Sequence, residues 1–254
     1  MPQQGVDDVA LDSVAWLEGH VVGPSRRRRC DIISLVRAPA PLAFAALVAE
    51  DEIVLTPEVF VPFEFPGQAR PATHVRSTLI VSSMQTLRKY GHYDAYVKRL
   101  DPAYHDDLVS LIAGTWIPVE IGLAHYLAAD ALELDVRTID SFGAEVSDRV
   151  NRSALALVLK ISRQGGVTPW TAFARVHRLR EETFDGTDIS VTKLGPKDAR
   201  FDWVGIPYAA VPYYRASFGG FLRALVQLFS ATAYTRFLTA HSTPTSMSYR
   251  ISWA

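Results

Sequence analysis

The chain has 254 residues, of which 48% are hydrophobic and 21% charged, with a formal net charge of -1. This composition is typical of a globular protein with a substantial core, and it excludes a disordered or fibrous chain. The small net charge gives no general attraction to nucleic acid or to an anionic membrane. Cys30 is the only cysteine, which excludes an internal disulfide, and no apolar run reaches the roughly 18 residues that span a bilayer. We therefore expect a cytoplasmic protein.

The first seventy residues differ in character from the rest of the chain. "DIISLVRA" and "DEIVLTPEVFVPFEF" are rich in β-branched and aromatic residues, which predicts short strands. Arg26 to Arg29 form a charge run that predicts either a solvated loop or a patch for an acidic or phosphate-bearing partner. The turn-rich segment "PGQARPA" is the best candidate for the boundary between this region and the rest of the chain. We predict a partly β or irregular N-terminal extension over residues 1–70 and an α+β ligand-binding-like domain over residues 71–254.

Helical patterns dominate the next hundred residues. We expect Thr73 to cap a helix in "HVRSTLIVSSMQTLRKYG", and Asp101 to cap another that has Pro102 in its first turn. Further helices are expected from Pro118, over residues 137–163, and over Trp170–Gly186 as one amphipathic helix capped by Thr168.

The period then changes from helical to alternating. "TDISVTKL" and "DARFDWVGI" alternate polar and apolar residues around the turn "GPKD", which predicts a β-hairpin. "YRASFGGFLRALVQLFSA" has apolar residues at helical spacing, and "AYTRFLTAHS" and "SMSYRISWA" suggest two more strands. The fold class is therefore α+β: a helical N-terminal half, then a β-β-α-β-β antiparallel sheet unit.

Several of these segments together resemble a known family. "HVRSTLIVSSMQTLRKYG", "TWIPVEIGLAHYLAADAL", "FDGTDISVTKLGPKDARFDWVGIP" and "YRISWA" resemble a paralogous family of myxobacterial proteins over about Val75 to Trp253, although Ser77 stands where that family has glycine. In outline the family is similar to haem–nitric-oxide-binding and vinyl-reductase-type small-molecule-binding domains. The resemblance implies a ligand held between a helical half and a β-β-α-β-β half. Function must still be argued from the site itself.

His177 is the first candidate side chain of such a site. On one continuous helix it would share a face with Trp170, Phe173 and Phe184. Three interpretations are open: a core histidine bonded to Glu181, a contact to an organic ligand, or a haem ligand. Haem is the weakest, because the Tyr-x-Ser-x-Arg motif that holds haem propionates in the relatives is missing, although Arg200 could serve in part. We leave the cofactor unknown. The candidate ligand-binding residues are Trp170, Phe173, His177, Phe184, Trp203 and Phe221.

Two other patterns have structural and functional interpretations. "HYDAYVKRLDPAYHDDL" brings His92, His105 and Asp106 together in sequence, as in metal-dependent phosphohydrolases, although its acidic residues fit helix caps better. The strip Ala216, Gly220 and Ala224 suits helix-on-sheet packing, and also self-association or a pocket wall.

The predicted function is a small-molecule-binding or sensory protein without evident catalytic activity. Its ligand would be apolar, and a homodimer or another protein partner is compatible with the sequence. The alternatives are a protein–protein interaction module with a filled core and a metal-dependent phosphohydrolase. We assign no catalytic residue and no metal ligand, and we recognise no nucleotide-binding or nucleic-acid-binding motif in the sequence.

Overall fold

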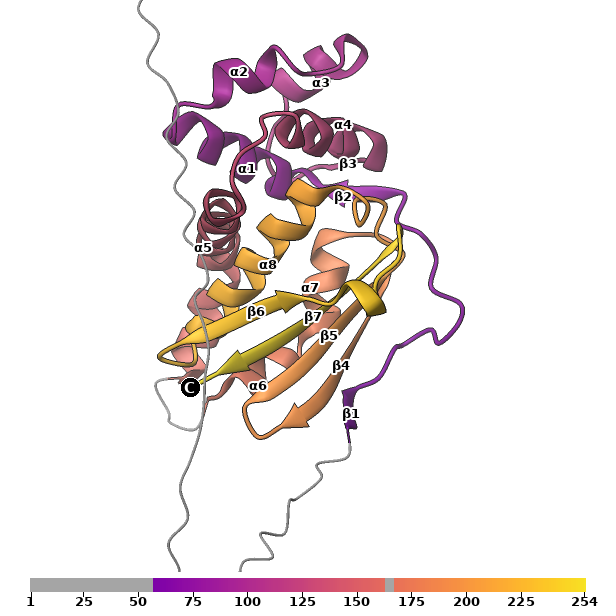
Figure 1. Cartoon of the computed structure of the whole chain (residues 1–254), viewed down its shortest axis with the longest axis vertical. Coiled ribbons are helices and arrows are strands. Elements are labelled where there is room, and N and C mark those ends of the chain that lie inside the picture. The colour runs from indigo at the N-terminus through magenta and orange to yellow at the C-terminus, as the bar shows by residue number, and fades with distance from the viewer. Residues whose placement is uncertain (1–56, 163–166) are drawn as a thin grey trace, which may run out of the picture. The chain divides into compact units, whose positions relative to one another are not determined.

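The computed structural model describes residues 57–162 and 167–254, with side chains left out over 151–162. These residues fall in one compact unit that spans Ile53–Ala254. Its helical half comes first in the chain and its sheet half second (Figure 1). The helical half contains α1 (Ser77–Lys89), α2 (Tyr93–Val97), the 3-10 turn η1 (Pro102–Tyr104), α3 (His105–Val109), α4 (Val119–Asp130) and α5 (Val136–Ser162). The predicted segments "DIISLVRA" and Arg26–Arg29 lie outside the described residues.

The sheet half is built around five antiparallel strands in the order β1-β4-β5-β7-β6. These strands are β1 (Glu58–Val61), β4 (Asp188–Gly195), β5 (Asp198–Val204), β6 (Ala233–Phe237) and β7 (Ser246–Trp253). The helices of this half are α6 (Pro169–Phe173), α7 (Val176–Thr183), α8 (Pro212–Gln227) and the 3-10 turn η2 (Thr239–His241). Strands β4 and β5 form the predicted hairpin at "GPKD", and β4-β5-α8-β6-β7 is the predicted β-β-α-β-β unit. The predicted α+β fold class is confirmed.

Strand β1 joins the sheet from far away in the sequence. It pairs with β4 at one edge, and the register shifts between Val59 and Val61. A second, two-stranded ribbon of β2 (His74–Arg76) and β3 (Trp116–Pro118) ties the start of α1 to the start of α4. The prediction that Thr73 caps α1 was wrong, because strand β2 lies between Thr73 and the helix. Arg76 is the N-cap of α1, and Thr73 donates its hydroxyl to Asp185 at 2.6 Å.

Alternation along β5 separates the two faces of the sheet. Ala199, Phe201 and Trp203 are buried, while Arg200 and Asp202 lie on the opposite face and form an ion pair of 2.9 Å. The buried face receives α8, where Phe218 lies 4.9 Å from Trp203 between ring centroids. Helix α8 therefore lies between the sheet and α5 (Figure 1).

Helices α5 and α8 approach so closely that glycine is required on both. A Cβ built at Gly143 would lie 1.7 Å from the carbonyl oxygen of Ser217, and one at Gly220 would lie 1.9 Å from that of Asp140. The helix-on-sheet interpretation of the small-residue strip is therefore wrong for Gly220, which faces α5. Backbone contact of this kind leaves no room for a side chain and fixes how the two helices cross.

The segment Trp170–Gly186 is two helices rather than the single expected one. Thr168 and Pro169 start α6 as predicted, with a capping box between Thr168 and Thr171, but α6 ends at Phe173. The chain then turns at Arg175 (φ -121°, ψ 14°) before α7 begins. This break changes the direction in which every later side chain of the segment points. None of the helices in the described ranges is long and apolar enough to cross a membrane.

Candidate functional site

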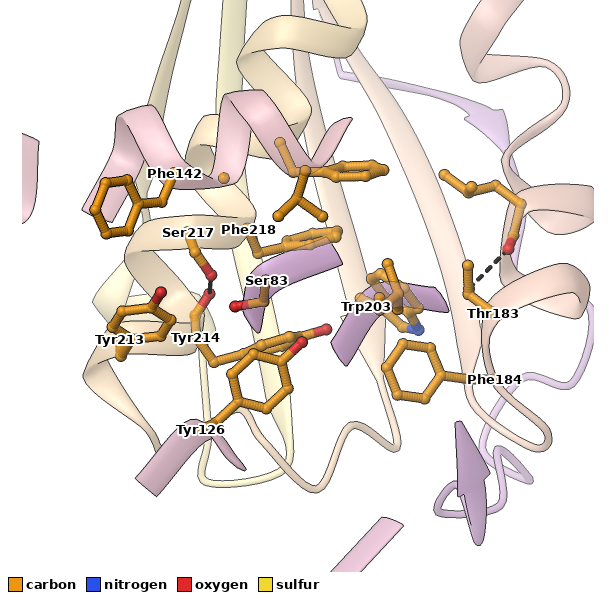
Figure 2. Close-up of a pocket in the computed structure, with 15 residues that line it drawn as sticks. Ser83, Tyr126, Phe142, Thr183, Phe184, Trp203, Tyr213, Tyr214, Ser217 and Phe218 are labelled. Carbon is orange, nitrogen blue, oxygen red and sulfur yellow. Dashed lines mark hydrogen bonds between the residues drawn. The ribbon is translucent and has the colours of Figure 1, made fainter. Parts of the chain in front are cut away.

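A cavity lies between the helical half and the sheet, and we call it the central cavity (Figure 2). The space between its wall atoms is about 540 Å³, including the part that is open to solvent, but the centre of a water molecule could occupy only about 40 Å³ of it. That is room for roughly three waters, since one needs about 10–15 Å³ on this measure. Its walls come from α1, α4, α5, α7, β5 and α8, with Phe184 just after α7. The lining residues are Leu79, Ser83, Tyr126, Phe142, Gly143, Val146, Leu179, Thr183, Phe184, Trp203, Tyr213, Tyr214, Ser217, Phe218 and Phe221.

Aromatic rings make up most of this wall. Tyr126 and Tyr214 meet edge to face at 4.7 Å between centroids, and Trp203 lies 5.3 Å from Phe184. No charged side chain of the described residues lines the cavity. An ion that entered the central cavity would lose its hydration without gaining a counter-ion, so the cavity suits an uncharged molecule.

The polar groups of the cavity are neutral hydroxyls. Burial raises the pKa of Tyr213 to about 12 and also raises the pKa values of Tyr126 and Tyr214, so all three phenols stay protonated at neutral pH. Figure 2 shows no hydrogen bond from the hydroxyls of Tyr126 and Tyr214 to another residue drawn. These two phenols can therefore donate to an acceptor atom of a ligand.

Ser83 is held in place from outside the cavity by a buried histidine. The Nε2 atom of His125 lies 3.0 Å from the Ser83 hydroxyl, and its Nδ1 atom lies 2.8 Å from the hydroxyl of Tyr96. Because burial disfavours the charged imidazolium, it lowers the pKa of His125 to about 3. The chain Tyr96–His125–Ser83 thus carries no charge, and sequence reasoning missed it because its members are far apart along the chain.

Trp203 contributes a hydrogen-bond donor that is not used. Its side chain lines the central cavity and is 2% exposed, and its indole Nε1 has no acceptor among the described residues. A buried donor without a partner costs free energy, which an acceptor on a bound molecule would recover.

The six candidate residues from the sequence divide into two groups in the structure. Phe184, Trp203 and Phe221 line the central cavity, whereas Trp170, Phe173 and His177 lie outside it. Trp170 and Phe173 instead pack on Trp253, at 5.0 and 5.9 Å between centroids. The break between α6 and α7 explains this separation, because it removes the shared face that one continuous helix would have given them.

His177 lies on the side of α7 that faces away from the central cavity. Its Nε2 donates to the carbonyl oxygen of Pro62 at 3.0 Å, and its Nδ1 lies 3.9 Å from both Glu64 and Asp188. The cavity-facing residues of α7 are Leu179 and Thr183. The interpretation of His177 as a histidine bonded to Glu181 does not match these contacts, since Glu181 pairs with Arg180 at 3.2 Å.

His92, His105 and Asp106 do not assemble into a metal site in the structure. The Nδ1 atom of His105 lies 3.3 Å from its neighbour Asp106, and His92 packs against Phe142. Within residues 57–162 and 167–254, the group that could hold a metal is instead Glu64, His177 and Asp188.

Comparison with solved structures identifies the architecture. The fold is similar to that of the Fe(II) unliganded H-NOX protein from K. algicida, with a TM-score of 0.52 at 10% sequence identity, and to that of a point mutant of the same protein, with 0.53 at 9%. Each alignment covers 70% of this chain and 96% of the other. The fold is H-NOX-like. This confirms the predicted similarity to haem–nitric-oxide-binding domains, while no family model and no curated protein matches the sequence.

The residues of the central cavity do not fit a haem. Among the residues whose side chains the structure describes, its lining contains no histidine, cysteine or methionine to bind the iron, and the pKa values of its tyrosines are raised, which works against a phenolate ligand. Nor does it contain a lysine or arginine for the propionates, and Arg200 lies on the opposite face of the sheet from Trp203. His177 could reach the cavity only if α7 rotated, because Leu179 is about 200° further round the helix.

Proposed function

We propose that this protein binds a small uncharged molecule in the central cavity and acts as a sensory or regulatory domain. The observation that carries the proposal is a cavity lined by aromatic rings and neutral hydroxyls, with the unpaired indole N–H of Trp203. Such a lining favours an aromatic or aliphatic ligand that carries one hydrogen-bond acceptor. Phe184, Trp203 and Phe221 are the predicted ligand-binding residues that meet this requirement.

Two features support sensing rather than catalysis. The fold is shared with H-NOX domains, and His125, the histidine bonded to Ser83 of the lining, is a weak base because burial lowers its pKa to about 3. The cavity lies where α5, α7, α8 and the sheet meet, so a ligand that widened it would have to move side chains of several elements at once.

Three probes of similar size test the polarity of the site. Acetophenone has a carbonyl acceptor, ethylbenzene lacks it, and benzoate is charged. We expect the melting temperature to rise most with acetophenone, less with ethylbenzene and not at all with benzoate, because a ligand stabilises only the folded state that binds it. Equal shifts with benzoate would contradict the proposal.

A matched pair of variants tests the location. Val146→Phe fills the central cavity and should remove the shifts, whereas Val136→Phe places the same ring at a 70% exposed position of the same helix and should preserve them. Native mass spectrometry of freshly purified protein should reveal a bound small molecule. A bare chain that also ignores all three probes would favour the interaction module with a filled core.

A further inference from the structure

Four charged or titratable side chains meet on the side of α7 opposite the central cavity, and we call them the carboxylate–histidine cluster. They are Glu64 from the segment after β1, His177 and Arg180 from α7, and Asp188 from the start of β4. The Nδ1 atom of His177 lies 3.9 Å from an oxygen of each carboxylate, and the potential ligand atoms of the three residues lie within 4.8 Å of one another. These residues come from three separate segments, so their convergence depends on the tertiary fold.

The hydrogen bond to Pro62 decides where the proton of a neutral His177 sits. A carbonyl oxygen can only accept, so Nε2 carries hydrogen and Nδ1 presents a lone pair. A backbone carbonyl that orients an imidazole in this way is the usual outer partner of a metal-binding histidine.

The lone pair on Nδ1 has no donor to satisfy it. Nδ1 is one of four buried side-chain nitrogen or oxygen atoms that lack a partner in the described part of the chain, and two of the others belong to Arg180 and Thr187 beside it. A lone pair that faces two carboxylates is unfavourable unless a cation lies between them.

Both carboxylates are oriented and still have free capacity. The Oδ1 atom of Asp188, which is the oxygen nearest Nδ1 of His177, accepts the backbone N–H groups of Glu64 and Ile189, and Oδ2 accepts that of Phe65, so the free lone pair of Asp188 is on Oδ2. The Oε2 atom of Glu64, which is the oxygen nearest Nδ1, accepts from Arg180 at 2.5 Å and keeps one lone pair. Counting Glu181, which pairs with the same guanidinium, three carboxylates and one arginine leave a charge of -2 for a cation to offset.

We propose that His177, Glu64 and Asp188 bind a divalent transition-metal ion of the Zn²⁺ type. A tetrahedral Zn²⁺ with bonds of about 2.0–2.1 Å places its ligand atoms about 3.3 Å apart, so the two separations of 3.9 Å and the third, which lies within 4.8 Å, require each side chain to move by less than about 1 Å. An imidazole ligand disfavours Mg²⁺ and Ca²⁺, which prefer oxygen. Water would complete the coordination from the side where Glu64 is 36% exposed.

The ion would tie the segment after β1 to α7 and to the first residue of β4. Arg180 would act as a positioning residue, since it holds Glu64 and touches no metal itself. The proposed metal site lies on a different face of α7 from the central cavity. If the metal proposal fails, the proposed ligand-binding function is therefore unaffected.

Zinc titration of the full, untagged chain by calorimetry tests the proposal. The chain should carry Cys30→Ser, because a thiol is itself a zinc ligand. We expect one Zn²⁺ per chain and a higher melting temperature with the metal.

His177→Ala should lower the affinity by at least about 100-fold, and Glu64→Gln by about 10–100-fold. The matched control is His105→Ala, which removes a half-buried histidine that also lies beside a carboxylate and should leave binding unchanged. Absence of binding to the parent chain at about 100 μM Zn²⁺ would overturn the proposal whether or not the variants fold. A His177→Ala variant that binds Zn²⁺ within threefold of the parent affinity would also overturn the proposal. In either case, a proton shared with the carboxylates would remain as the partner of Nδ1.

Discussion

Helix α7 presents Leu179 and Thr183 to the central cavity and His177 and Arg180 to the carboxylate–histidine cluster. On the cavity side, neutral groups are stabilised by packing, which is non-directional and tolerates replacements of similar volume. On the cluster side, each charge depends on named partners at fixed distances. One short helix thus separates a site that can adapt its shape from a site that cannot.

The largest effect should come from the cluster. Asp188→Ala removes the acceptor of three backbone N–H groups, and we expect the free energy of unfolding to fall by about 3–5 kcal/mol. Chemical denaturation measures this loss. Asp188→Asn keeps one side-chain oxygen and should lose less. A loss below about 1 kcal/mol for Asp188→Ala would show that the cluster is as tolerant as the cavity.

The cavity wall should be intolerant at one place, where α5 meets α8. Gly143→Ala forces a methyl group against the carbonyl of Ser217, and overpacking of this kind costs about 1–3 kcal/mol or more. Gly219→Ala is the control on α8, because the nearest atom to its Cβ, in Tyr249, lies at an ordinary 3.5 Å. That variant should be neutral or stabilising through helix propensity. Equal melting temperatures for the two variants would contradict the close crossing.

His125 should make the cavity side sensitive to acid. Its pKa is about 3 in the folded protein against 6.5 as the ordinary value, so the unfolded chain binds the proton first as the pH falls. Stability is fully present above pH 6.5 and is lost towards pH 3, with a slope approaching about 1.4 kcal/mol per pH unit. Denaturation of His125→Gln across this range should show a shallower slope. An unchanged slope would assign the acid sensitivity to other groups.

The smallest effect should concern the indole N–H of Trp203. Trp203→Phe removes the donor and should reduce the preference for acetophenone over ethylbenzene by about 1 kcal/mol, or about fivefold. The ratio of the two affinities is the measurement, since both probes experience the same change in cavity volume. Tyr126→Phe, which removes a phenolic donor, is the comparison variant. If only this variant loses the preference for acetophenone, the ligand's acceptor atom contacts Tyr126 of α4 and not Trp203.

Local patterns predicted most of the fold. Pro169 at the start of α6, the cap Asp101 and the "GPKD" hairpin each act within a few residues, so their effects are visible in the sequence. The β2–β3 ribbon was missed, because strands of three residues have no detectable period. Similarly, the pairing of β1 with β4 joins residues more than a hundred positions apart, which no local pattern records.

The site was harder to predict than the fold. Phe184 and Trp203 belong to the cavity through the hairpin that follows α7, but the position of His177 depends on the break at Arg175. The sequence around that break contains neither glycine nor proline, so helical spacing continued through it. Glu64, the partner of His177, lies over a hundred residues earlier, and only the folded chain brings the two together.

The shifted register of β1 also bears on how the folded protein behaves at high concentration. An open sheet edge offers its unpaired backbone groups to a second copy, and natural sheets reduce that hazard with short or bulged edge strands and with charge. Here β1 is four residues long and irregular, and β6 at the other edge carries Arg236. Aggregation is therefore expected to begin from opened chains, with the intact sheet resisting growth by strand addition.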